Sequence, residues 1–199
     1  MYHGPKAKVA RSLGLAVSPK TEKVLERRNF GPGQHGQGRR RAPSVYKTQL
    51  VEKQRLRFTY NISEKDMSRV FRDANRLVGS TGDWIMVILE SRLDAVIYRM
   101  GFARTMFAAR QYVAHGHFLV NGKRNFTPSR RIKEGDVIEV RERSKNHVQI
   151  AEAIQGAPEP PPYLEVDKGK MQGKMITRPL REQIPVTLNE QLVVEYYSR

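Results

Sequence analysis

The sequence contains no cysteine, a single tryptophan and no long hydrophobic run. The absence of cysteine excludes disulfide bonds, thiolate catalysis and cysteine-ligated zinc. No window approaches the roughly 18 apolar residues that a membrane-spanning helix requires. The first residues, MYHGPK, lack the apolar core of a secretory signal. We therefore expect a cytoplasmic protein with no membrane partner, no metal centre and no cofactor.

Acidic residues are also scarce. The 199 residues include 36 lysines and arginines but only 20 aspartates and glutamates, which gives a net charge of +16. Residues 1–60 have a net charge of +11 and residues 91–145 of +7, whereas residues 61–90 and 146–199 each have −1. Positive charge that is segregated in this way indicates a polyanionic partner. Nucleic acid is the first candidate, and an anionic membrane surface is the alternative.

Residues 1–43 show no sustained hydrophobic period. A stretch rich in glycine and proline, Gly31 to Gly38, is followed by Arg39, Arg40 and Arg41. Glycine and proline disfavour regular structure, and adjacent arginines repel one another unless phosphates neutralise them. We expect a basic extended segment, which is either a disordered tail or becomes ordered only on a nucleic-acid surface.

The next segment has helical patterns. Ser44 can cap a basic helix that extends to about Tyr60. Ser63 begins an amphipathic helix, and residues 84–89 predict a further buried helix. Near the C-terminus the sequence shows only strand-like pieces at 163–166 and 186–188 and a last helix from Asn189. Because residues 163–199 have too few apolar residues to fold alone, we predict one mainly helical body domain made from residues 44–90 and 146–199.

The most informative stretch runs from Arg92 to Val140. Two short helices are predicted, with cap signals at Ser91 and Thr105 and with glycines at their ends. A strand then enters a type I′ turn at Asn121-Gly122, and a second strand follows Asp136. The predicted fold class is α+β: the mainly helical discontinuous domain carries an inserted RNA-binding domain, residues 91–145, made of a helix-turn-helix and a small β-sheet.

Four arginines and no lysine lie between Arg92 and His117. Arginine makes forked contacts with phosphate oxygens, which favours an RNA-binding role for this segment. Tyrosines and phenylalanines of the same segment either stack on bases or fill the core. With the basic residues of the neighbouring segments, the candidate RNA-binding residues are Arg39, Arg40, Arg41, Lys53, Arg55, Arg57, Arg92, Arg99, Arg104, Arg110, His115, His117, Lys123 and Arg124.

The sequence gives little support for metal binding or catalysis. His115 and His117 lack further ligands at suitable spacing for a metal, so we expect them to end a helix and to contact phosphate. Asp94 can be read as a catalytic aspartate or as a helix cap, and its place in a first helical turn favours the cap. The sequence shows no nucleophile elbow, so we predict no catalytic residues.

Short motifs in this stretch resemble the S-four RNA-binding domain: RLD at 92–94, YRMGF at 98–102, HGH at 115–117, VNG at 120–122 and GDVI at 135–138. The flanking motifs resemble the bacterial ribosomal protein S-four family, notably PGQHG at 32–36, EKQRLR at 52–57 and LEVD at 164–167. The resemblance covers nearly the whole chain in order. Some relatives carry a cysteine-ligated zinc near the N-terminus, which this chain cannot bind, and its N-terminal end is slightly shorter.

The resemblance implies a structural component of the small ribosomal subunit and not an enzyme. It implies a primary small-subunit rRNA-binding protein that nucleates assembly of the subunit body. It further implies contact with ribosomal protein S-five, other small-subunit proteins and messenger RNA near its entry path, with an influence on translational accuracy. Two alternatives stay open: an rRNA-modifying enzyme, which would need a further domain, and a regulatory binder of messenger RNA.

Overall fold

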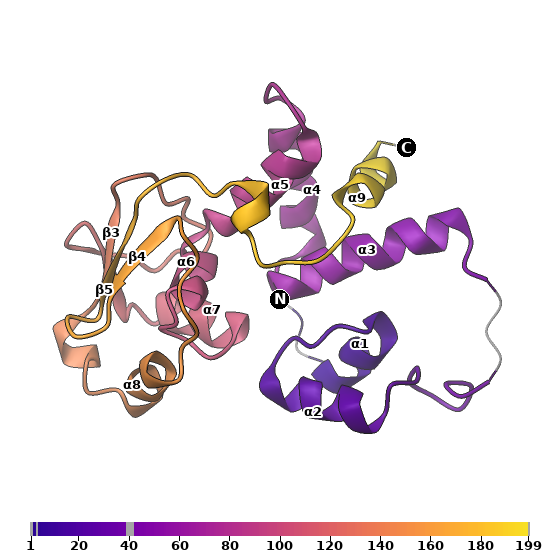
Figure 1. Ribbon diagram of the computed structural model, residues 1–199, viewed down its shortest axis with the longest axis horizontal. Coiled ribbons are helices and arrows are strands. Elements are labelled where there is room, and N and C mark those ends of the chain that lie inside the picture. Colours follow the sequence, from indigo (N-terminus) through magenta and orange to yellow (C-terminus); the bar gives the residue numbers. More distant parts are fainter. Residues whose placement is uncertain (1, 3, 39–41, 199) are drawn as a thin grey trace. The chain divides into compact units, whose positions relative to one another are not determined.

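The computed structural model describes residue 2 and residues 4–38 and 42–198, and these residues form helices and one small antiparallel sheet, which confirms the α+β class. Arg39, Arg40 and Arg41 lie outside the described residues. The chain divides into two compact units, Met1–Gly82 with Thr187–Arg199 (unit 1) and Asp83–Val186 (unit 2). Figure 1 labels their elements.

The first unit is helical. Its helices are α1 (Lys6–Leu13), α2 (Pro19–Arg27), α3 (Val45–Thr59), α4 (Glu64–Ala74) and α9 (Glu190–Tyr197). As predicted, the hydroxyl groups of Ser44 and Ser63 accept hydrogen bonds from backbone N–H groups and begin α3 and α4. The predicted last helix is also confirmed, with Asn189 as its cap. Helix α9 lies along α3, where Gln49 Nε2 donates to Glu195 Oε2 at 2.9 Å.

The prediction of an extended N-terminal segment was wrong for the residues of α1 and α2. Gly14 closes α1 in the left-handed conformation, with φ of 61°, and a capping box between Ser18 and Thr21 begins α2. The Arg11 guanidinium then donates to the carbonyl oxygens of Phe30 and Gly31 at 3.0 and 2.8 Å, which holds the following loop against α1. Helices of eight and nine residues bury too few apolar side chains to show a hydrophobic period.

The second unit combines helices and the sheet. Helix α5 (Thr81–Glu90) begins at the boundary between the units and is followed by α6 (Leu93–Arg99), α7 (Met106–Ala114) and α8 (Val148–Gln155). Two 3-10 turns, η1 (Glu142–Ser144) and η2 (Arg181–Gln183), complete its helical elements among the described residues. Helices α6, α7 and α8 share one hydrophobic core with the sheet, centred on Ile97, Phe118, Ile138, Ile150 and Tyr163.

The sheet has five antiparallel strands in the order β2-β1-β3-β5-β4. They are β1 (Phe118–Val120), β2 (Lys123–Arg124), β3 (Val137–Val140), β4 (Leu164–Asp167) and β5 (Gln172–Met175). The turn between β1 and β2 has positive φ at both Asn121 (52°) and Gly122 (72°), which confirms the predicted type I′ geometry.

The boundaries between the units differ from the predicted ones. We expected residues 146–199 to join the helical body, but residues up to Val186 belong to the unit with the sheet. The reason is strand pairing: β5 pairs with β3 from Val137 to Glu139, so the segment that carries β4 and β5 completes the sheet. The piece at 186–188, predicted as a strand, is not one, because it has no strand partner in the described residues.

Candidate RNA-binding surfaces

A buried ion-pair network holds α6 and α7 together. The Nε and Nη2 atoms of Arg92 donate to the two carboxylate oxygens of Asp94 at 3.1 and 2.9 Å, and Arg110 Nη1 approaches the same carboxylate at 3.4 Å. The exposed fraction is 6% for the Arg92 side chain and 1% for that of Asp94. Arg92, and not the predicted Ser91, is the N-cap of α6. The carboxylate of Asp94 is thus fully engaged in structural contacts, which contradicts a catalytic role.

A second buried network lies between α5, α6 and Tyr163, the residue before β4. The Arg99 guanidinium makes a forked contact with Glu90, with the shortest distance, 2.6 Å, between Nη2 and Oε1. The Tyr163 hydroxyl donates to Glu90 Oε2 at 3.1 Å, and the Glu90 side chain is fully buried. Burial and the neighbouring Glu90 charge raise the pKa of the Tyr163 hydroxyl, so it stays protonated and able to donate.

Helix α3 contains a comparable pair. Lys53 Nζ donates to Glu64 Oε2 at 2.9 Å, and only 4% of the Lys53 side chain is exposed. Burial acts to raise the pKa of Glu64, but hydrogen bonds from Lys53, Tyr197 and Arg57 bring it below its usual value of 4.5. Arg57 contacts the same carboxylate at 3.3 Å. Arg55 is occupied as well, because its guanidinium donates to Leu13 O and to Glu52.

These contacts correct part of the predicted site. Three of its residues, Lys53, Arg92 and Arg99, are almost fully enclosed and are paired with carboxylates, so their charge is compensated inside the fold and is not presented to solvent. Arg55, Arg57 and Arg110 are partly exposed but also paired. Arg104, in the turn between α6 and α7, is different: 62% of its side chain is exposed, and its pair with the exposed Glu152 can open to admit a phosphate.

The hairpin of β1 and β2 presents cations to solvent. Lys123 and Arg124 are exposed, and within the described residues neither forms an ion pair. The Arg124 guanidinium donates to Gly116 O at 3.2 Å and lies over the Phe126 ring, 4.6 Å from its centroid. Half of the Phe126 side chain is exposed. An aromatic ring beside two cations is suited to an unpaired base and its phosphates.

A third exposed cation, Lys133, joins this surface through Asp136. The carboxylate of Asp136 accepts from the Asn121 side chain at 2.8 Å and from Lys133 N at 2.9 Å. The hairpin turn and the loop before β3 are therefore fixed side by side. We call Lys123, Arg124 and Lys133 the hairpin surface. Lys133 was not among the predicted residues, because its sequence neighbourhood gives no sign that the loop returns to the turn.

His115 and His117 belong to a cluster of three imidazoles that follows α7. The His117 ring lies 6.1 Å from that of His115 and 5.4 Å from that of His147, measured between centroids. His117 Nδ1 is 3.0 Å from the Ser144 hydroxyl oxygen. The three rings are not arranged so that they could hold one metal ion together, and no other such group of His, Asp or Glu occurs among the described residues.

Burial lowers the pKa of His117 from 6.5, and the neighbouring His147, His115, Arg141 and Arg124 lower it further. Below pH about 6.5 the unfolded chain therefore binds more protons than the folded chain. We expect the free energy of unfolding to fall as the pH drops below about 6.5 and to level off below the folded pKa.

The pKa on which this expectation depends is measured by an NMR titration of the His117 ring, in the free protein and in the RNA complex. A pKa below 6.5 in the free protein that rises on RNA binding would place phosphate near the ring. A free-protein pKa at or above 6.5 would contradict the role of burial and of the surrounding cations.

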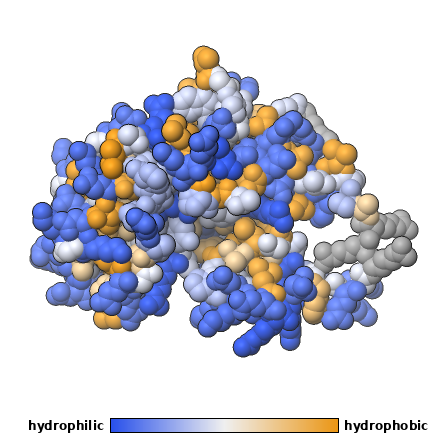
Figure 2. Space-filling model, in the orientation of Figure 1, coloured by the Kyte–Doolittle hydropathy of each residue, from blue (hydrophilic) through white to orange (hydrophobic). Residues whose placement is uncertain are grey.

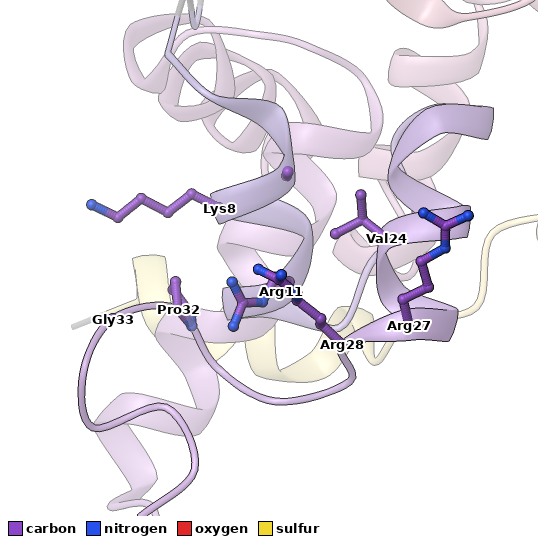
Figure 3. A pocket seen from close by; sticks show the side chains of 8 residues that line it. Lys8, Arg11, Val24, Arg27, Arg28, Pro32 and Gly33 are labelled. Carbon is purple, nitrogen blue, oxygen red and sulfur yellow. The ribbon is translucent and has the colours of Figure 1, made fainter.

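A cavity of about 550 Å³ lies between α1, α2 and the loop after α2. Its walls include four basic residues, Lys8, Arg11, Arg27 and Arg28. Figure 3 shows Arg11 and Arg28 near its centre, with Lys8 and Arg27 on opposite sides. Arg11 is bound to the loop, but Lys8, Arg27 and Arg28 form no ion pair with any residue that the structure describes. Sequence reasoning missed this cluster because it did not predict the two helices that assemble it.

The visible surface is largely hydrophilic. Hydrophilic residues cover most of the face drawn in Figure 2, with apolar residues scattered among them. In the part of the chain that is described, no helix is both long and apolar enough to span a bilayer.

Comparison with known proteins identifies the family. Residues 1–90 match the family described as ribosomal protein S4/S9 N-terminal domain, and residues 91–138 match the S4 domain. The chain is 50% identical to small ribosomal subunit protein uS4 of Micrococcus luteus over 195 residues, which cover 96% of this chain and 94% of the relative. The chain belongs to the uS4 family.

The chain is similar to uS4 proteins of other bacteria as well. Small ribosomal subunit protein uS4 of Geobacillus stearothermophilus is 46% identical over 198 residues, covering 100% of this chain and 98% of the relative. That of Pseudarthrobacter chlorophenolicus is 47% identical over 198 residues, covering 97% and 95%. Members of the uS4 family are structural proteins of the small ribosomal subunit and not enzymes, which confirms the expectation drawn from the sequence.

Proposed function

We propose that this uS4 chain binds small-subunit rRNA directly and early, and so nucleates assembly of the subunit body in the cytoplasm. The observation that carries the proposal is the separation of roles among its cations. Buried arginines such as Arg92 and Arg99 fix each helix in place, and exposed cations such as Lys123 and Lys8 are left for phosphate. Nothing in the described residues offers a catalytic centre, and the family has a structural role.

Direct binding is supported by preorganisation. Each unit has its own core, and the hairpin surface is fixed by backbone and side-chain hydrogen bonds that involve Asn121 and Asp136. A surface that is already ordered loses little conformational entropy on binding, so the protein does not need a neighbour to order it. Affinity should come mainly from phosphate neutralisation, and specificity from the folded shape of the RNA.

We extend the proposal to contact with ribosomal protein S-five and to an influence on translational accuracy near the messenger RNA entry path. The support for this step is membership of the uS4 family. Its test is the misreading rate of reconstituted small subunits that carry variants of the exposed residues of this chain. A rate that does not respond to any such variant would remove the accuracy role and leave rRNA binding intact.

The binding proposal is tested with naked small-subunit rRNA in the absence of other ribosomal proteins. We expect specific binding with a protected footprint and with an affinity that falls steeply as salt rises. Order-of-addition reconstitution should place this chain before proteins whose binding depends on it. Binding that required other small-subunit proteins to be present first would contradict the proposal.

A further inference from the structure

A second cavity in unit 1 differs in chemistry from the basic one. It measures about 400 Å³ and lies between α1 and α3, and its walls include Tyr2, Val9, Leu50, Val51 and Phe58. The rings of Tyr2 and Phe58 meet edge to face with their centroids 5.3 Å apart. The size falls within the range of about 300–1,000 Å³ that is usual for small-ligand pockets. This is an aromatic and aliphatic cavity with room for a flat ring.

The two cavities adjoin. Lys8 and Pro32 line both of them, so one wall separates the basic cavity from the aromatic one. Lys47 and Arg57 also border the aromatic cavity. A molecule that spans both would place an apolar ring on one side of Lys8 and negative charge on the other side, near Arg27 and Arg28.

Polar atoms without partners lie on the wall of the aromatic cavity. Gln54 Oε1 and Arg57 Nε are buried and have no hydrogen-bond partner among the described residues. Both residues line the cavity and bring an amide and a guanidinium group to its wall, and such groups can bond to the polar edge of a ligand.

We propose that these adjoining cavities hold one unpaired nucleotide of the bound RNA, with its base in the aromatic cavity and its phosphate beside Lys8, Arg27 and Arg28. A nucleobase combines a flat ring with donors and acceptors on its edge, and its phosphate carries the negative charge that complements Lys8, Arg27 and Arg28. This inference rests on the proposed rRNA binding and adds a defined nucleotide pocket to it. The alternative occupant of the aromatic cavity is an apolar side chain of a neighbouring protein, but such a side chain would not account for the basic residues of the adjoining cavity.

The test fills the aromatic cavity without changing charge. Ser12 lies on its wall and is exposed, so Ser12→Trp adds bulk there. Gln191→Trp, at an exposed position of α9 that lines neither cavity, is the matched control. We expect Ser12→Trp to weaken binding to naked small-subunit rRNA by about 5- to 100-fold, the range for loss of one stacked base. The control should bind like the original chain.

Ultraviolet cross-linking of the unaltered chain to the same rRNA supplies a second readout that does not depend on a variant's folding. Cross-links should map to Tyr2 or Phe58. Equal affinities of the Ser12→Trp and Gln191→Trp chains, or cross-links that avoid both rings, would overturn the inference while rRNA binding itself stands. A Ser12→Trp chain that binds rRNA normally but fails to join other small-subunit proteins would assign the cavity to a protein and also overturn it. Failure of the unaltered chain to bind rRNA would instead refute the proposed function.

Discussion

Replacing Arg99 with alanine should destabilise the unit of residues 83–186 by about 3–5 kcal/mol, the usual cost of leaving a buried charge without its partner. The Glu90 carboxylate is fully buried and would lose the forked contact with the Arg99 guanidinium, while the Tyr163 hydroxyl would still donate to it. The measurement is native-state hydrogen exchange of core amides such as those of Ile97 and Phe118, since a protein with two units need not unfold in one step.

Two further variants test whether the loss of stability comes from breaking the buried ion pair or simply from removing a positive charge. Arg104→Ala removes an exposed arginine and should change stability by no more than about 1 kcal/mol. The double substitution Glu90→Leu with Arg99→Leu removes both charges and should recover most of the loss, because apolar replacements of a buried pair are often nearly neutral. Equal stability of the Arg99→Ala and Arg104→Ala chains would contradict a structural role for Arg99.

Removing the three cations of the hairpin surface should weaken rRNA binding on the order of 10²-fold at about 0.1 M salt. Each cation that contacts phosphate contributes about 0.7 to 0.9 to the slope of log affinity against log salt, so Lys123→Ala, Arg124→Ala and Lys133→Ala together should reduce the slope by about 2 to 3. The fold should persist, because all three side chains are exposed. Filter binding or fluorescence anisotropy over a salt series measures both quantities.

The matched control removes the same charge elsewhere. Lys65, Arg69 and Arg72 are exposed cations of α4, within a segment of nearly neutral net charge. Alanine at these three positions should change the slope by much less. A slope that fell equally in both triple variants would mean that net charge, and not the hairpin surface, governs binding.

Most of the correct predictions of the fold came from local signals, although the cap of α6 is Arg92 and not the predicted Ser91. Caps at Ser44, Ser63 and Thr105 and the turn at Asn121-Gly122 were all read correctly, because each depends on a few adjacent residues. The unit boundary was not predicted correctly, since the pairing of β5 with β3 joins residues 33 to 37 positions apart: Glu139 pairs with Gln172, and Val137 pairs with Lys174. Helices α1 and α2 were not predicted, because a helix of only about two turns is too short to show a clear hydrophobic period.

The sequence predicted which segments carry the candidate site, but not which of their cations are buried and which are exposed. The sequence shows that arginines crowd the segment after Arg92, and it shows nothing of their partners. Arg99 pairs with Glu90, nine residues earlier, and Tyr163 reaches the same carboxylate from 73 residues away. Contacts over such distances depend on the folded core, so a buried arginine and an exposed one look alike in sequence.

The central claim is that exposed cations bind RNA, whereas buried arginines hold the helices in place. It is tested most directly by comparing the salt slope of rRNA binding for two double variants, Lys123→Ala with Arg124→Ala and Glu90→Leu with Arg99→Leu. We predict a slope reduced by about 1.5 to 2 for the hairpin pair and an unchanged slope for the buried pair. A reduced slope for the buried pair with an unchanged slope for the hairpin pair would contradict the account.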